Sequence, residues 1–241
     1  MSGHSKWATI KRAKGVNDAK RGQLFTKIAG TISIAVKQGG SSDPSTNHRL
    51  RLAIDKARGA NMPKDSIDRA IQRGAGGVGG AALEELVYEG FGPGGVAIIV
   101  ETVTDKKQRT VAEVKNIFEK NGGSMGAQGS VAYQFDRVGE IMVKSEGKTL
   151  DELLDMALES GADDVESESG LAYFYTQATD LMQVKTVLEE KGMSVEEAGI
   201  VYKPKTFITD RNIQEKVESL MHKLEDLDDV QKVYSNFDFS V

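Results

Sequence analysis

The sequence predicts an α+β protein of three domains, an N-terminal helical domain and two α/β sandwich-type (ferredoxin-like) domains, one inserted in the other. Three observations support this fold class. Apolar residues recur at helical spacing up to about residue 73, and strands and helices alternate after residue 80. The charge changes sign at the same place: residues 1–75 hold 15 Lys and Arg against 5 Asp, whereas residues 76–241 hold 16 against 31 Asp and Glu.

Three short helices are predicted in the N-terminal part. The first spans 24–37, with Phe25, Ile28, Ala29, Ile32 and Val36 on one face. Asn47 can cap the second, whose inward residues are Leu50, Ala53, Ile54 and Ala57. The third begins near Pro63, a residue that suits a first helical position. Separate apolar faces on three helices indicate a small helical domain.

The stretch "GAGGVGG" at 74–80 indicates a linker, and β-rich runs follow at 85–91 and 95–103. Pro93 and Gly94 between these runs fit the centre of a type II turn. A helix is then expected from a cap near Asp105 to Gly122, and the run "SVAYQF" at 130–135 is expected to form a strand.

Residues 140–202 show the order strand, helix, strand, strand, helix, strand, which is that of a ferredoxin-like unit. Thr149 and Glu152 predict a capping box for its first helix. One inward apolar stripe is expected on that helix: Leu150, Leu153, Leu154, Ala157 and Leu158.

A final helix and a final strand, after residue 204, lack partners of their own. The predicted domains are therefore 1–80, a split domain of 84–136 plus 204–241, and an inserted domain of 137–203.

No catalytic constellation stands out. The chain has no Cys, and His4, His48 and His222 have no other ligand at metal spacing beside them. "GFGPGG" precedes a strand rather than a helix, so it does not predict a dinucleotide site. We therefore expect a protein that is not an enzyme and binds no cofactor. One metal hypothesis is Cu(II) or Ni(II) at His4 if Met1 is removed.

The basic N-terminal part predicts a polyanionic partner. Lys and Arg neutralise phosphates, and Trp7 can stack on an unpaired base. The candidate nucleic-acid-binding residues lie in an arm, residues 1–22, and in the helical domain: His4, Lys6, Trp7, Lys11, Arg12, Lys14, Lys20, Arg21, Lys27, Arg49, Arg51, Arg58, Lys64, Arg69 and Arg73.

Long stretches of the chain resemble the YebC/PmpR family. They are "MSGHSKWATIKRAKGVNDAKRGQLFTKI", "GGSSDPSTNHRLRLAIDKARGANMPKDSIDRAI", "YEGFGPGGVAIIVETVTD" and "GGSMGAQGSVAYQF". The resemblance covers essentially the whole chain and implies three domains, one of them inserted in another. It also implies cytoplasmic, DNA-binding transcriptional regulation for bacterial members and translational activation at the ribosome for mitochondrial ones. Gly30 and Thr31 replace a charged pair common in the family, so no binding role is carried over to them.

The prediction is a cytoplasmic, nucleic-acid-binding regulator of gene expression, with DNA as the first target. Ribosomal or transfer RNA is the alternative, which Trp7 and the absence of a clear helix-turn-helix signal favour mildly. A second alternative is a protein-interaction module for an acidic partner. The acidic domains would be repelled by a polyanion and could bind another protein, and no membrane partner is expected.

Overall fold

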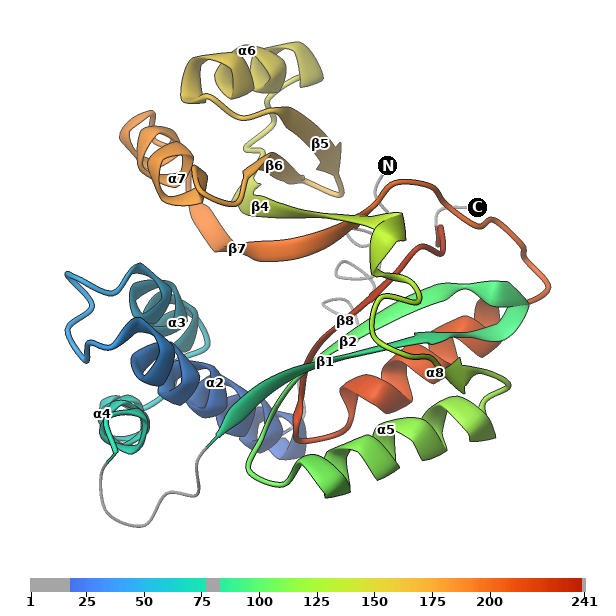
Figure 1. Ribbon diagram of the computed structural model, residues 1–241. Coiled ribbons are helices and arrows are strands. Elements are labelled where there is room, and N and C mark those ends of the chain that lie inside the picture. Colours follow the sequence, from blue (N-terminus) through green and yellow to red (C-terminus); the bar gives the residue numbers. More distant parts are fainter. Residues whose placement is uncertain (1–17, 77–82, 240–241) are drawn as a thin grey trace. The chain divides into compact units, whose positions relative to one another are not determined.

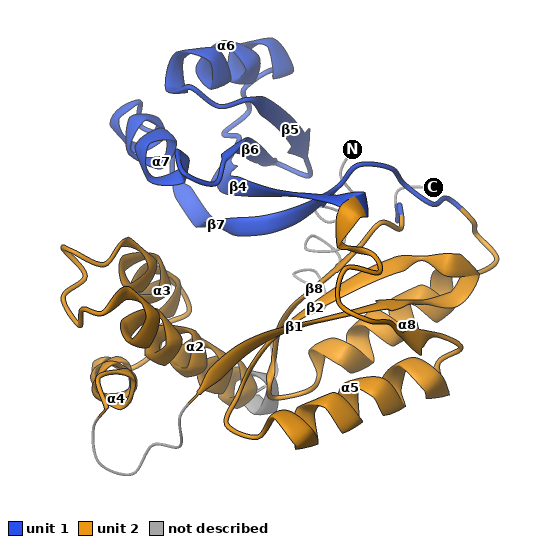
Figure 2. Cartoon of the chain, in the orientation of Figure 1, with its two compact units in different colours: residues 1–14, 134–209, 238–241 blue, residues 15–133, 210–237 orange. Residues whose placement is uncertain are grey.

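The computed structural model describes residues 18–76 and 83–239, with side chains from residue 21 onward. These residues fall into two compact units, which are coloured separately in Figure 2. Unit 1 holds residues 134–209 with 238–239, and unit 2 holds 18–76 and 83–133 with 210–237. No helix in the described part of the chain is long and apolar enough to cross a membrane.

Unit 2 begins with three helices packed around a small apolar core (Figure 1). They are α2 (Asp18–Gly39), α3 (His48–Gly59) and α4 (Lys64–Gly74). Their core combines Ile28 and Ile32 of α2 with Leu50 of α3 and Ile67 of α4. The α2 and α4 backbones approach so closely that a Cβ on Gly74 would lie 2.4 Å from the carbonyl oxygen of Ser33. Glycine is therefore required where these two helices meet.

The rest of unit 2 is a four-stranded antiparallel sheet, with strand order β3-β1-β2-β8, packed against two helices. Buried residues of both helices, among them Phe118 and Leu220, supply the core. The elements are β1 (Glu84–Phe91), β2 (Ala97–Thr104), α5 (Lys107–Lys120), β3 (Ser124–Met125), α8 (Gln214–Glu225) and β8 (Val230–Ser235). The C-terminal strand therefore completes a sheet that begins 146 residues earlier, at Glu84.

Unit 1 is a ferredoxin-like βαββαβ unit with the antiparallel strand order β5-β6-β4-β7. Its two helices supply Leu153 and Leu188 to the core, together with Phe174 from the sheet. The elements are β4 (Phe135–Lys144), α6 (Leu150–Ser160), β5 (Asp164–Glu168), β6 (Leu171–Gln177), α7 (Leu181–Glu190) and β7 (Val195–Pro204). Phe135 pairs with Pro204, so the chain enters and leaves the unit at neighbouring strand ends.

Several local predictions are confirmed, as is the α+β fold class. The Asn47 side chain accepts a hydrogen bond from the Leu50 N–H at 3.0 Å, and Thr149 and Glu152 form the capping box. Pro93 and Gly94 make the predicted turn. Gly94 has a φ of 69°, and the Gly95 N–H donates to the Gly92 carbonyl at 3.1 Å.

Other local predictions are wrong. Residues 130–135 do not form a strand: residues 132–134 make a 3-10 turn, and β4 begins only at Phe135. Asp105 does not cap α5, because Lys106 occupies the cap position without a side-chain bond. The leucines of α6 divide between two faces: Leu153 is buried, whereas Leu150, Leu154 and Leu158 are exposed.

The loop before β4 is held by a buried carboxylate. Glu89 of β1 accepts hydrogen bonds from the backbone N–H groups of Gly129, Val131 and Ala132 at 2.6, 2.8 and 2.8 Å. Burial alone raises the pKa of Glu89, but these three donors outweigh it, so the pKa lies below its ordinary value. The charged form of Glu89 therefore stabilises the folded state.

We predict that Glu89→Gln lowers the free energy of unfolding by about 2 kcal/mol at neutral pH, because an amide cannot accept all three bonds. The stabilisation from a depressed pKa is fully present above the pKa of the unfolded chain and is lost as the pH falls through the pKa of the folded state, so the deficit should shrink below about pH 4.3. Urea unfolding of both proteins across this range measures the effect. Glu84→Gln, on an exposed residue of the same strand, is the control. A deficit that persists at low pH would contradict the charge-based explanation.

Candidate nucleic-acid interface

The helical part of unit 2 carries a strong excess of positive charge. Residues 21–76 hold ten Lys and Arg against four Asp and no Glu. The inward positions of the three helices are apolar, so most of these cations lie outside the core. A polyanion would be attracted to this region and repelled by the acidic remainder of the chain.

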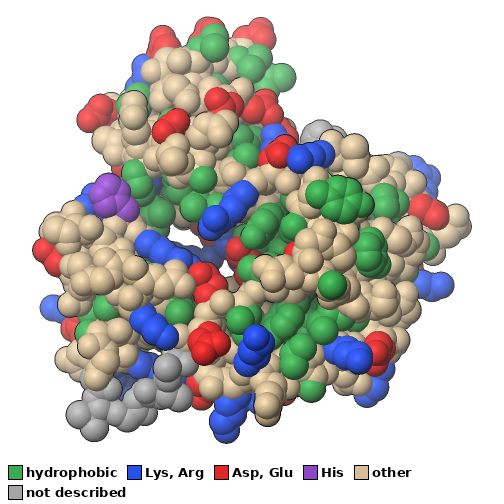
Figure 3. Space-filling model, viewed as in Figure 1, with side chains coloured by type: hydrophobic (Ala, Val, Ile, Leu, Met, Phe, Trp, Pro, Cys, Tyr) green, Lys and Arg blue, Asp and Glu red, His purple; other side chains and the backbone are tan. Residues whose placement is uncertain are grey.

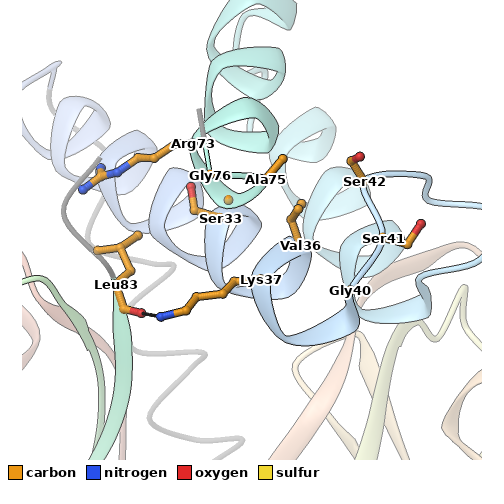
Figure 4. Close-up of a pocket in the computed structure, with 11 residues that line it drawn as sticks. Ser33, Val36, Lys37, Gly40, Ser41, Ser42, Arg73, Ala75, Gly76 and Leu83 are labelled. Carbon is orange, nitrogen blue, oxygen red and sulfur yellow. Dashed lines mark hydrogen bonds between the residues drawn. The ribbon is translucent and has the colours of Figure 1, made fainter. Parts of the chain in front are cut away.

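Two hollows lie along the contact between α2 and α4 and share Ser33 and Arg73. The first, of about 480 Å³, is also lined by Lys37 and by the loop residues Ser41 and Ser42 (Figure 4). The second, of about 290 Å³, is lined by Phe25 and Met62 among others and by Arg69. The two hollows thus adjoin at Ser33 and Arg73, and cations from both helices line them; together we call them the groove.

Arg69 and Arg73 are one helical turn apart on α4, and both are exposed. Arg69 donates through Nε to the Asp65 carbonyl and through Nη2 to the Ser66 hydroxyl, each at 3.1 Å. Arg73 forms no ion pair with any described residue. Lys37, which the sequence did not single out, donates to the Leu83 carbonyl at 2.8 Å (Figure 4). Within the described part of the chain, the donors of Arg73 are thus unpaired at the point that the two hollows share.

Hydrogen bonds from the side chains of Asn47 and Arg51 hold the loop between α2 and α3, which borders the groove. The buried Asn47 donates through its amide to the carbonyls of Ala35 and Ser41 at 2.8 and 2.9 Å. Arg51 donates to the carbonyls of Pro44 and Ser45 at 3.0 and 2.9 Å. Hydrogen bonds from the Ser45 hydroxyl and N–H hold the pKa of Asp43 below its ordinary value.

Two predicted binding residues join the helices to the sheet of unit 2. The Lys27 ammonium donates to the carbonyl of Glu225, the last residue of α8. Arg49 donates to Glu85 of β1 and to Gln38 of α2. These two side chains, like Arg51, have partners within the folded chain, which the sequence did not reveal.

The remaining candidate binding residues either lie on the described helices or fall outside the described residues. Arg21 lies 5.9 Å from the centre of the Phe25 ring, Arg58 lies 3.9 Å from Asp55, and Lys64 is exposed at the start of α4. Lys20 lies in the first turn of α2. The candidates His4, Lys6, Trp7, Lys11, Arg12 and Lys14, and with them the metal hypothesis at His4, fall outside the described residues.

The connection between α3 and α4 has the length found in helix-turn-helix motifs. Four residues, 60–63, separate the helices, and Asn61 has a φ of 56°. A 3–4-residue turn, often with a residue that tolerates the left-handed region, joins the helices of such motifs. The exposed residues Arg69, Gln72 and Arg73 lie on the second helix of this pair.

Comparisons with known proteins match almost the whole chain. Residues 5–77 match the model of the TACO1/YebC N-terminal domain, and residues 83–237 match that of the TACO1/YebC second and third domain. A protein of Treponema denticola is 52% identical over 99% of this chain and 96% of its own length. A protein of Trichlorobacter lovleyi is 51% identical over 100% of this chain and 97% of its own length. Both are named probable transcriptional regulatory protein.

The fold also matches a crystal structure, that of a conserved hypothetical protein from Aquifex aeolicus. The two chains are 44% identical and superpose with a TM-score of 0.85 over 91% of each. The similarity therefore extends from the sequence to the arrangement of helices and strands.

We predict that Lys27→Met lowers the free energy of unfolding by about 1 kcal/mol, because it removes a cation from the C-terminal end of α8. Lys64→Met is the same substitution on an exposed residue. It should change the free energy of unfolding by no more than about 0.5 kcal/mol. Urea unfolding compares the two. If Lys27→Met left stability unchanged and weakened nucleic-acid binding instead, Lys27 would be a phosphate contact.

Proposed function

The chain belongs to the TACO1/YebC family, and we propose that it regulates gene expression by binding nucleic acid through the helical part of unit 2. The observation that carries this proposal is the groove between α2 and α4, edged by Lys37, Arg69 and Arg73 in a region without Glu. The names of the family's bacterial relatives agree with a regulatory role.

The groove suits a phosphate backbone better than a small cofactor. Cofactor pockets are mostly apolar and aromatic, with a few polar groups. Among the described residues, the larger hollow is lined by Ser, Gly, Ala, Lys and Arg together with Val36 and Leu83, and Phe25 is the aromatic residue of the smaller one. We therefore propose binding rather than catalysis as the activity.

We propose duplex DNA as the target. The short turn between α3 and α4 supports this choice, because a second helix presented in that way can enter the major groove. Arg69, Gln72 and Arg73 are of the residue types that donate to base edges and phosphates. Phosphate contacts would supply most of the affinity, and the described residues account for only part of the positive charge.

Ribosomal or transfer RNA is the second candidate. Trp7 favours it, because aromatic side chains stack on unpaired bases. In that case the same cations would contact the RNA backbone. The bases would be recognised by stacking, because the major groove of an RNA duplex is too deep and narrow for side chains to reach the base edges.

The affinity for duplex DNA should fall steeply with salt, with a log–log slope of about −4 to −7 for ~5 to 8 neutralised phosphates. The double substitution Arg69→Ala and Arg73→Ala should weaken binding and make the slope shallower by about 2 units. Fluorescence anisotropy at several salt concentrations measures both. Lys115→Ala with Lys120→Ala removes two exposed cations from α5 and is the control. Equal slopes for the two double variants would exclude the groove as the contact surface.

DNA and RNA targets should be separable by competition and sedimentation. If DNA is the target, unlabelled duplex DNA should displace a bound duplex at lower concentration than transfer RNA or an RNA duplex. The protein from lysed cells should also remain outside the ribosomal fractions of a gradient. Sedimentation with ribosomal particles that persists after DNase treatment would overturn the DNA proposal in favour of RNA.

A further inference from the structure

Unit 1 exposes a row of leucines on α6. Leu150, Leu154 and Leu158 are 53%, 42% and 79% exposed. Their spacing of four residues places them on one side of the helix, along about 12 Å at 1.5 Å per residue. We call these three residues the leucine stripe. Figure 3 shows hydrophobic side chains beside acidic ones over α6, at the top of the view.

The stripe belongs to a firmly placed helix. At 100° per residue, the buried face of α6, formed by Leu153, Ala157 and Ser160, lies about 90° around the helix from the stripe. The capping box holds its first turn, and Gly161, at a φ of 81°, ends it in the left-handed conformation. The leucines therefore stay exposed while the helix remains docked on its sheet, and their exposure does not require the helix to unfold.

Acidic side chains flank the stripe. At 100° per residue, Asp151 and Asp155 form the row next to the leucines on the solvent side of the helix. Both are exposed, and neither makes an ion pair with a described residue. Glu159 does so with Lys191. Residues 137–203 together hold six Lys and Arg against fifteen Asp and Glu, so the surroundings are also negative.

We propose that the leucine stripe and its two aspartates bind a basic amphipathic helix of another protein. Apolar side chains of such a helix would cover the leucines, and its Lys or Arg residues would lie opposite Asp151 and Asp155. The negative charge disfavours the other occupants. A second copy would bring two aspartate rows together, and nucleic acids and anionic membranes would be repelled.

This interaction is independent of nucleic-acid binding, because it uses only residues of unit 1. It assigns the acidic part of the chain a role in which its charge attracts rather than repels a partner. Apolar contact supplies affinity, and the aspartates supply orientation and selection of a cationic partner.

The first test uses a fluorescein-labelled synthetic helical peptide with Leu at four-residue intervals and Lys on one flank. Anisotropy should show saturable binding to the full-length protein, weakened at least about tenfold by Leu154→Ala with Leu158→Ala. Alanine favours helix, so α6 should remain folded, as circular dichroism can verify. Ile200→Ala with Phe207→Ala removes two exposed apolar side chains of the same unit and should have little effect.

Charge is tested with Asp155→Asn against Glu190→Gln, an exposed residue of α7. The first should weaken peptide binding by about threefold at low salt and have less effect at 0.5 M salt, because screening is then strong. The second should have no effect at either concentration. Peptide binding that is the same in the stripe variant and its control would overturn the proposal.

The occupant in cells is identified by placing a photo-crosslinking amino acid at Leu154 and sequencing the segment it captures. The proposal requires a segment of another protein with apolar residues at helical spacing and Lys or Arg beside them. Capture of α6 from a second copy, of nucleic acid or of lipid would overturn it, as would the absence of any crosslink. The same crosslinker at Glu190 reports background capture.

Discussion

The pairing of β8 with β2 is the constraint on which the rest of the fold depends. Ile98 pairs with Ser235, and the Asn236 side chain accepts a hydrogen bond from the Ala97 N–H at 2.8 Å. The sheet of unit 2 is therefore complete only after the last helix has been made. Unit 1 can interrupt this sheet because its own ends meet, with Phe135 paired to Pro204 and the Lys205 N–H donating to the Gln134 carbonyl at 2.9 Å.

The same sheet anchors the basic helices. Lys27 contacts the end of α8, Thr31 donates to the Gln231 side chain at 3.0 Å, and Arg49 contacts Glu85. Gly30 lies beside this contact, where a Cβ would lie 3.5 Å from Val103. Gly30 and Thr31, which replace a charged pair common in the family, thus lie against the sheet. The cations accordingly include some that hold the helices in place and others, such as Arg73 of α4, that form no ion pair with a described residue.

Local signals predicted the elements well, because caps and turns depend on neighbouring residues. Asn47, the capping box at Thr149 and the Pro93-Gly94 turn were all readable from short windows of sequence. The partners of Lys27 and Arg49 were not readable, because Glu225 and Glu85 are remote in the chain. Charge counting finds a basic region, but it cannot tell an anchoring cation from a free one. The leucines of α6 were all predicted to face inward, and three of them do not, because both of its apolar rows have helical spacing.

The basic helices of unit 2 and the acidic unit 1 carry opposite charges, which affects the choice of partner in both proposed interactions. The basic helices attract a polyanion and repel a cationic protein segment, and the acidic unit does the reverse. Each surface thus selects its own partner and rejects the other's, which is specificity obtained by repulsion as well as attraction. The acidic residues also lower the net attraction of the whole chain for unrelated nucleic acid, because the formal net charge is −5 despite the basic N-terminal part. Under the proposed function, the affinity for nucleic acid would then come from close contacts between the cations of the groove and the phosphates.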